Sequence, residues 1–349
     1  MKKKKIDIRE LSKKEIQEFF LSHNEPSFKG TQVYQWLWKK GVHDFDLMTN
    51  LSFGHRALLK TNFEIKHIKI DEYQRSIDGT IKNAVKLHDQ FIVESVLIPT
   101  SKRSTACVSS QVGCSLDCIF CATAALKRIR NLNADEIYDQ VVAMDNQSKL
   151  FFNRPLTNIV FMGMGEPMMN YNNVIKAADI IHDQKGLNIG ARKITISTVG
   201  MVKKIRQYTK EKHPYNIAFS LNATNDFERS KLMPINKKYN LKSCLDALKD
   251  YSDKLKRPAM IEYVLISGVN DTYEDAIRLA KIIKSLDCKL NVIPYNPIKG
   301  ESFKRPTEYE INNFINNIRS KSTIITVRWS QGKDVNAACG QLYTTNEKK

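Results

Sequence analysis

From about residue 100 onward, short apolar runs alternate with longer amphipathic segments, and this alternation limits the possible fold more than any other feature. The amphipathic segments have the period of helices, at residues 134–147, 173–184, 241–255 and 273–286. The apolar runs are typical of strands, at residues 105–111, 157–163, 193–198, 215–221, 259–267 and 289–295. Because strands that alternate with helices build parallel sheets, we predict an α/β fold in which six strand–helix units form a partial barrel. Its active site is expected at the carboxyl ends of the strands.

The residues before this alternation have a different character. Up to about residue 80 the sequence is polar with helical periodicity, which predicts a small N-terminal helical domain with Trp36 and Trp38 in its core. Two runs rich in Val and Ile then predict a strand pair that ends at Pro99. We therefore divide the chain into residues 1–80, 81–99 and 100–349.

Charge favours a polyanionic partner. The 349 residues include 55 Lys and Arg against 37 Asp and Glu, a net charge of +18 that suits nucleic acid, although a merely basic solvated surface has the same composition. No run of about 18 apolar residues indicates a membrane span. Lys2 to Lys5 lack the apolar stretch that follows the charges of a signal peptide. We expect a cytoplasmic protein.

Four of the seven cysteines lie between residues 107 and 121. This clustering indicates cysteines that act as metal ligands or as reactive thiols in a reducing compartment. Cys114, Cys118 and Cys121 form a CxxxCxxC motif on one loop just after the first predicted barrel strand. A structural zinc site normally takes four ligands, and the seven histidines are scattered without a matching second half-site. A cubane iron–sulfur cluster held by three cysteines instead leaves one iron open to chelate a substrate.

The motif, with an aromatic residue before its last cysteine, resembles that of the radical S-adenosylmethionine superfamily. There the open iron binds the amino and carboxylate groups of S-adenosylmethionine, and an electron from the cluster cleaves it to a 5′-deoxyadenosyl radical. Further segments resemble the RlmN/Cfr family of RNA adenine methyltransferases over nearly the whole chain, at residues 107–114, 163–167, 232–236, 268–271 and 337–342. The resemblance implies a radical-SAM barrel, a [4Fe-4S] cluster on the three cysteines, and two molecules of S-adenosylmethionine per turnover.

Two cysteines outside the cluster loop, Cys107 and Cys339, are candidates for nucleophilic chemistry. Carbon 2 of adenine has no lone pair with which to attack a methyl group, whereas a thiolate is a good nucleophile that could take the methyl first. The resemblance implies that Cys339 is the residue methylated first. It also implies that Cys107 resolves the protein–RNA adduct through a transient disulfide, and that Glu94 accepts a proton. The alternatives are inert buried thiols and a solvent-facing carboxylate.

The resemblance also implies a set of cofactor contacts near strand ends. They are Gly165, Glu166, Ser197, Ser220, Leu221, Asn222 and Asn296. Glu166 is expected to pair with the ammonium of the methionine moiety, and Gly165 to let the backbone approach it. Asn222 departs from the family, which commonly has His there, and this puts any proton transfer at that position in doubt.

Three further features have weaker interpretations. Cys244 and Cys288 have no motif around them and are expected to be core residues. Lys127 to Arg130 form a basic stretch that we expect to contact RNA, against the alternative of a solvated charged face.

The resemblance implies methylation of adenine C2 in 23S rRNA, at the peptidyl-transferase centre, and in the anticodon loop of tRNA. The alternative within the family is Cfr-type methylation of C8. Other classes are a radical enzyme acting on a small molecule or protein, and a zinc module that binds nucleic acid by charge. We expect 23S rRNA and tRNA as partners, an electron donor such as flavodoxin, no membrane, and a monomer.

Overall fold

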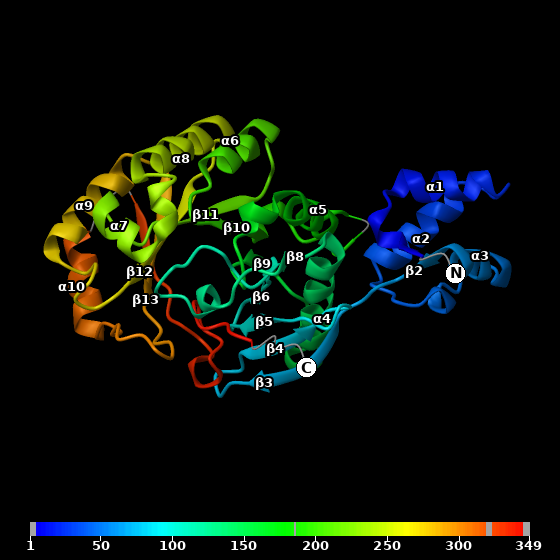
Figure 1. Ribbon diagram of the computed structural model, residues 1–349, viewed down its shortest axis with the longest axis horizontal. Coiled ribbons are helices and arrows are strands. Elements are labelled where there is room, and N and C mark those ends of the chain that lie inside the picture. The colour runs from blue at the N-terminus through cyan, green and yellow to red at the C-terminus, as the bar shows by residue number, and fades with distance from the viewer. Residues whose placement is uncertain (1–4, 185, 319–322, 345–349) are drawn as a thin grey trace.

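The computed structural model describes residues 5–184, 186–318 and 323–344, so that Lys2 to Lys4 lie outside the described residues. Its largest feature is a ten-stranded sheet, with helices over one face and a separate group of N-terminal helices attached at one side (Figure 1). The strand order is β14-β13-β12-β11-β10-β9-β6-β5-β4-β3. The strands from β6 to β14 in this order are parallel, whereas β3, β4, β5 and β6 pair antiparallel.

The antiparallel strands of the large sheet are β3 (Lys69–Arg75), β4 (Ile81–Lys86) and β5 (Ile92–Pro99). The parallel strands are β6 (Ser104–Cys107), β9 (Asn158–Phe161), β10 (Ile194–Thr198), β11 (Asn216–Ser220), β12 (Ala259–Leu265), β13 (Cys288–Pro294) and β14 (Ile324–Val327). Two small sheets pair β1 (Ile6–Asp7) with β2 (Phe63–Glu64) and β7 (Gln111–Val112) with β8 (Arg130–Asn131).

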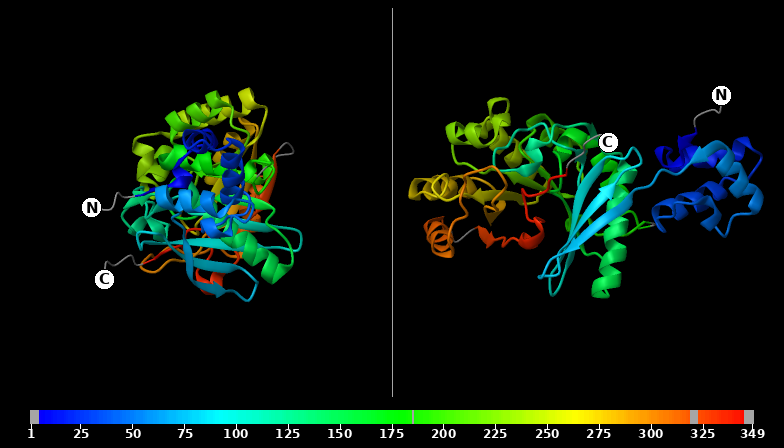
Figure 2. Two further views of the ribbon diagram at one scale, coloured as in Figure 1. Left: turned by 90° about the vertical axis from the view of Figure 1, so that its right-hand side faces the viewer. Right: turned by 60° about the horizontal axis from the view of Figure 1, so that its bottom comes forward.

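Helices cover the outer face of the parallel strands, where α4 packs on α5, α6 on α8 and α9 on α10 (Figures 1 and 2). They are α4 (Ala134–Phe152), α5 (Tyr171–His182), α6 (Val202–Glu211), α7 (Asp226–Leu232), α8 (Leu241–Leu255), α9 (Tyr273–Lys284) and α10 (Glu308–Ile318). A capping box between Asn133 and Glu136 starts α4. None of the described helices has the length and apolarity that crossing a membrane requires.

The six predicted barrel strands are confirmed as β6 and β9 to β13, and the predicted strand pair as β4 and β5. Two strands were not predicted. β3 lies within the segment expected to be helical, and its side chains are nearly all exposed, so that it lacks the alternation of a half-buried strand. β14 is a four-residue edge strand without a fully buried side chain. With it, the described part of the large sheet has seven parallel strands instead of six.

The N-terminal helices are α1 (Lys13–Ser22), α2 (Phe28–Trp38) and α3 (Phe53–Asn62). Ser12 and Glu15 form the capping box of α1. Trp38 is buried, as expected, and its ring meets the edge of Tyr138 on α4 at 5.1 Å between centroids. Trp36 is only partly buried, and the Lys40 ammonium lies 3.3 Å from its ring centroid. The core prediction therefore holds fully for Trp38 and in part for Trp36.

A buried ion cluster joins the beginning of the chain to the barrel. Arg9 is 3% exposed and donates to both carboxylate oxygens of Asp139, at 2.8 and 2.9 Å, and to Asp135 at 3.1 Å. Both aspartates lie on α4. Burial raises the pKa of the Asp139 carboxyl, while the Arg9 guanidinium opposes that rise. Removing one charged side chain would leave the others buried without a counter-charge, so we expect the stability of the protein to be sensitive to substitution in this cluster.

We expect Arg9→Met to lower the free energy of unfolding by about 3–5 kcal/mol, because two buried carboxylates lose their cation. Lys14→Ala is the control, since it breaks an exposed pair with Glu18 and should cost about 0.5 kcal/mol or less. Chemical denaturation followed by circular dichroism measures both changes. Equal stability of the two variants would contradict a structural role for Arg9.

Candidate active site

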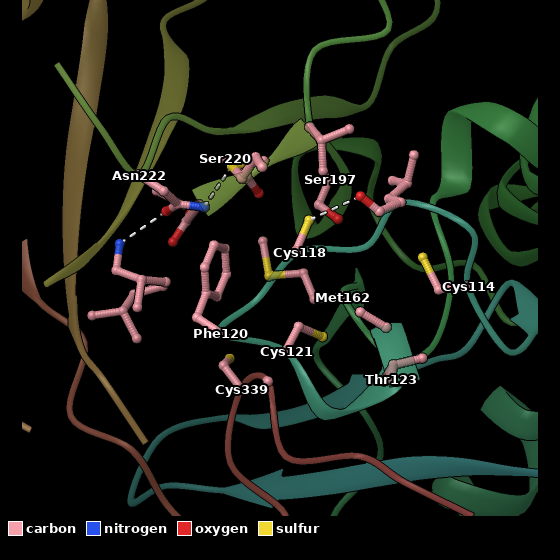
Figure 3. A pocket seen from close by; sticks show the side chains of 18 of the residues that line it. Cys114, Cys118, Phe120, Cys121, Thr123, Met162, Ser197, Ser220, Asn222 and Cys339 are labelled. Atoms are coloured by element: carbon pink, nitrogen blue, oxygen red, sulfur yellow. Dashed lines mark hydrogen bonds between the residues drawn. The ribbon is translucent and has the colours of Figure 1, made fainter. Parts of the chain in front are cut away.

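A cavity lies at the carboxyl ends of the parallel strands, and the sheet curls around it. Side chains from β10 to β13 line it together with Met162, just after β9, and Arg328, just after β14. The predicted site residues that line it are Cys114, Cys118, Cys121, Gly165, Glu166, Ser197, Ser220, Asn222, Asn296 and Cys339. Ten predicted positions thus meet in one space, which we call the cofactor cavity (Figure 3).

The three motif cysteines occupy the loop between β7 and β8. Gly113 starts this loop with φ +73°, and a Cβ there would stand 2.3 Å from the carbonyl oxygen of Lys127, so only glycine fits. The amide of Cys114 donates to the carbonyl of Leu126 at 2.9 Å, which closes the loop. Figure 3 shows Cys118 and Cys121 near the middle of the view and Cys114 toward its right-hand side.

The three thiols suit a cluster better than a single ion. Burial is the largest cause of the raised pKa of the Cys114 thiol, which is about 11. Burial also raises the pKa of the Cys118 thiol, and the neighbouring thiols and Glu166 add to that rise. Within the described residues, no three His, Cys, Asp or Glu side chains gather closely enough to hold one metal ion. A cubane gives each cysteine its own iron, so that spaced thiolates on a loop fit a [4Fe-4S] cluster.

Gly165 and Glu166 form a tight turn after β9. Gly165 has φ +94°, and a Cβ would lie 2.5 Å from Cβ of Gln111. Glu166 is 2% exposed and accepts from the amides of Met168 at 3.1 Å and Val199 at 3.0 Å. Burial raises the pKa of its carboxyl to about 7, and these hydrogen bonds limit the rise. A buried carboxylate held in this way can receive an ammonium group.

Most of the strand-end positions expected to contact the cofactor line the cavity, with one exception. Ser220 and Asn222 line the cavity, but Leu221 between them is fully buried elsewhere and is not among the lining residues. Alternation along the strand end turns its side chain to the opposite face. Asn222 adopts φ +56°, and its Oδ1 accepts from the amide of Val264 at 2.9 Å. Asn tolerates this left-handed conformation, which gives it a structural role here.

Cys339 lies on a loop that is fastened to the cluster loop. Its carbonyl accepts from Nδ2 of Asn296 at 3.0 Å, and the carbonyl of Gly340 accepts from the amide of Ala122 at 2.7 Å. Thr123 donates to the carbonyl of Leu342, also at 2.7 Å. Cys339 and Cys121 therefore face the same space, as Figure 3 shows.

Cys107 and Glu94 lie outside the cofactor cavity. Cys107 ends β6 and lines a second cavity, which Cys339 also lines. Burial, then Cys339, raises the pKa of the Cys107 thiol to about 12. Glu94 is 5% exposed, lies 3.4 Å from Nζ of Lys82, and accepts from the amide of Tyr343 at 2.7 Å. Among the described residues, the lining of neither cavity includes Glu94.

Three ionisable residues of the cavity lining were missed from the sequence: Glu262, Tyr295 and Arg328. Arg328 approaches Oε2 of Glu262 at 3.9 Å and donates to Sδ of Met162 at 3.1 Å. Cys339 is the largest influence that raises the pKa of Arg328. The Glu262 oxygen and the Tyr295 hydroxyl are buried without hydrogen-bond partners in the described part of the chain, which suits a polar ligand. Glu262 is a charged residue inside the apolar run 259–267, and this pattern was the signal that could have identified it as a site residue.

The remaining cysteines and the basic stretch have other roles. Cys244 on α8 and Cys288 at the start of β13 are buried core residues, as predicted. All seven cysteines are free, so the structure does not support a standing disulfide. Arg130 is committed to ion pairs with Asp89 and Glu136, at 2.6 and 2.7 Å, which leaves only Lys127 and Arg128 of the basic residues exposed.

Comparisons with known proteins agree with this site. Residues 108–280 match the model of the radical SAM superfamily, and residues 6–65 match that of the ribosomal RNA large subunit methyltransferase N-terminal domain. The chain is 52% identical over 342 residues to the probable dual-specificity RNA methyltransferase RlmN of Flavobacterium psychrophilum, covering 98% of this chain and 99% of that protein. It is 39% identical over 353 residues to the dual-specificity RNA methyltransferase RlmN of Desulfotalea psychrophila, covering 99% and 97%. A radical SAM methyltransferase structure from Sphaerobacter thermophilus superposes with a TM-score of 0.91 at 38% identity, covering 97% and 99%.

We expect Cys118→Ala to lose the iron that wild-type protein binds on anaerobic reconstitution, because one cluster ligand is removed. Cys244→Ala removes another buried thiol outside the cavity and should keep its iron. Elemental analysis for iron and zinc measures the result. Iron retained by Cys118→Ala, or a colourless wild type that carries zinc alone, would contradict the cluster assignment.

Proposed function

Because the chain belongs to the RlmN family of radical-SAM RNA methyltransferases, we propose that it methylates carbon 2 of adenine in 23S rRNA and in the anticodon loop of tRNA. The rRNA target is the adenine at the peptidyl-transferase centre. The observation that carries this proposal is the position of Cys339, which lines one cavity with the three cluster cysteines and another with Cys107.

The cofactors supply the radical. Cys114, Cys118 and Cys121 would hold the [4Fe-4S] cluster, which when bound would supply the electron for reductive cleavage of S-adenosylmethionine. Glu166 holds the ammonium of the methionine moiety, and Gly165 lets the backbone approach it. Ser197, Ser220, Asn222 and Asn296 complete the polar lining. Two molecules of S-adenosylmethionine are consumed, one for the methyl group and one for the radical.

Cys339 carries the one-carbon unit. Its thiolate would take the methyl group of one S-adenosylmethionine, which leaves as S-adenosylhomocysteine. A hydrogen atom passing from that methyl to the 5′-deoxyadenosyl radical would leave a carbon radical that adds to C2 of the adenine. The adduct would then return one electron to the cluster and lose the C2 proton. Cys107 then attacks the Cys339 sulfur and breaks its bond to the methylene carbon, which takes up a proton as the methylated base leaves, and a disulfide forms for the duration of one turnover. Both cysteines line the second cavity, which supports this pairing.

Glu94 is the proposed proton acceptor, and it acts after the carbon–carbon bond has formed. Burial raises the pKa of its carboxyl, while Lys82 and the amide of Tyr343 oppose the rise. Glu94 contacts Tyr343, which lies four residues after Cys339 in the sequence. Since Glu94 does not line either cavity, the proton reaches it through a rearrangement of this segment or through water.

The N-terminal region, residues 1–80, is proposed to contact RNA, and residues 81–99 to carry Glu94 beside the core formed by residues 100–349. Lys127 and Arg128 add exposed positive charge near the cluster loop. We further propose that the protein acts as a cytoplasmic monomer with an electron donor such as flavodoxin.

Mass spectrometry of digested RNA tests the proposed function. Reconstituted enzyme, reductant and S-adenosylmethionine, incubated with rRNA or tRNA transcripts, should produce 2-methyladenosine. Cys339→Ala should produce none, because the methyl carrier is missing, while Cys288→Ala should remain active. An 8-methyl product would identify the Cfr-type reaction instead. Methylation by Cys339→Ala would rule out the proposed mechanism.

A further inference from the structure

The cluster loop is a thin wall between the cofactor cavity and solvent. Along residues 114–120 the side chains alternate between its two sides. Those that line the cavity are Cys114, Leu116, Cys118 and Phe120. Those between them are exposed, namely Ser115, Asp117 and Ile119. A single layer of backbone therefore separates the cluster cysteines from the outer face of this loop, and an electron that arrives at this face has a short distance to cross.

The cluster loop rests on α7 and on the turn that follows this helix. The amide of Ile119 donates to the carbonyl of Leu232 at 3.1 Å, at the end of α7. Leu232 and Ile235 belong to the same apolar group as Cys118. The outer face of the cluster loop is thus continuous with the exposed side chains of residues 226–238.

Apolar and cationic side chains share this continuous surface. Ile119 is 39% exposed, and Phe227 on α7 is 71% exposed. Lys231, Lys237 and Lys238 are exposed around them. The ammonium of Lys231 lies 3.9 Å from the centroid of the Phe227 ring. We call these five residues the outer patch.

The surroundings of the outer patch are positively charged. Two exposed carboxylates lie near it, Asp117 on the cluster loop and Asp226 at the start of α7. Asp226 already accepts from the amide of Leu241 at 2.7 Å. Lys127 and Arg128, on the returning arm of the cluster loop, add further exposed cations. Exposed cations therefore outnumber exposed carboxylates here, and the field of this surface attracts an acidic partner.

We propose that the outer patch is the docking surface for an acidic protein that carries a one-electron redox centre and reduces the cluster. The inference rests on the proposed function and adds the surface where the electron donor binds. Electron-transfer encounters are small and transient, and a few apolar side chains among charged ones suit them. The step moves one electron from the donor, which is oxidised, to the bound cluster, which is reduced, and no bond forms or breaks.

The position of the outer patch favours a protein donor over RNA as its occupant. An RNA base that reacts at Cys339 needs a surface that leads into a cavity lined by Cys339. None of the five residues of the outer patch lines the cofactor cavity or the second cavity. An electron donor needs only to come close to the cluster from outside, and the exposed side of the cluster loop allows that approach.

Two reductants separate docking from chemistry in the full-length reconstituted protein. Reduced flavodoxin, used as an acidic flavoprotein, has to dock, whereas dithionite is a small ion that needs no docking surface. With Lys231→Glu and Lys237→Glu combined, we expect 5′-deoxyadenosine formation driven by flavodoxin to fall about tenfold, because attraction becomes repulsion. Formation driven by dithionite should stay at the wild-type level. Lys203→Glu, which reverses an exposed cation on α6, is the control and should keep both rates.

Direct binding provides a readout that does not depend on turnover. Isothermal titration calorimetry of unreduced protein with oxidised flavodoxin should show an affinity that falls with added salt and falls about tenfold in the double lysine variant. Ile119→Asp should also weaken binding, while its iron content stays at the wild-type level. Ile324→Asp, at a 61% exposed position on β14, is the matched control and should bind as wild type does. Unchanged affinity in both patch variants would overturn the proposal.

Failure of this inference can be told apart from failure of the proposed function. A double lysine variant that loses affinity for RNA and keeps its affinity for flavodoxin would assign the outer patch to RNA and refute the docking surface. A wild type that forms 2-methyladenosine, combined with equal flavodoxin-driven rates in the double variant, refutes only the docking surface. A wild type that cleaves S-adenosylmethionine through docked flavodoxin but never methylates RNA refutes the proposed reaction and keeps the docking surface.

Discussion

The proposed catalytic geometry depends on the hydrogen bonds that fasten the C-terminal segment to the rest of the molecule. After β14, residues 329–344 run toward the antiparallel strands, where Asp334 accepts from Oγ of Ser76 at 2.6 Å and Asp78 accepts from the amide of Gly332 at 2.7 Å. Gly332 has φ +67°, and a Cβ there would stand 2.7 Å from Ala337. These contacts and those to the cluster loop hold Cys339 at the junction of the two cavities. A sulfur on a loose loop could not meet the reacting geometry.

The antiparallel strands thus serve the site as well as the sheet. The turn between β3 and β4 supplies Asp78 and Ser76, and β5 supplies Glu94, which accepts from Tyr343. Arg328 approaches Oε2 of Glu262 at 3.9 Å and lines the second cavity together with Cys107 and Cys339. Buried thiols disfavour their charged forms, and a nearby guanidinium opposes that effect. The segment that carries Cys339, the proposed methyl acceptor, therefore also carries Arg328.

The sequence predicts those parts of the site whose chemistry requires a local pattern. The cluster cysteines stand on one loop, and the Gly165–Glu166 turn needs a glycine, so both were found with their strands. The side chain of Leu221, predicted as a cofactor contact, lies outside the cavity lining, because a family motif does not specify which of three successive side chains faces inward. Arg328 was missed because it follows an edge strand, β14, that lacks a buried alternation. The link between residues 76–80 and 332–336 joins positions some 250 residues apart, and no local pattern specifies it.

The most direct test is to follow the methyl hydrogens of a methyl group already on Cys339. Protein is first loaded with a trideuterated methyl at Cys339 in the absence of RNA, and is then given RNA and unlabelled S-adenosylmethionine for one turnover. The account predicts that the methyl group on adenine carries two deuterium atoms and that the third appears in 5′-deoxyadenosine. An unlabelled methyl group on the RNA would show that the carbon came directly from the cofactor, and would contradict the central role of Cys339.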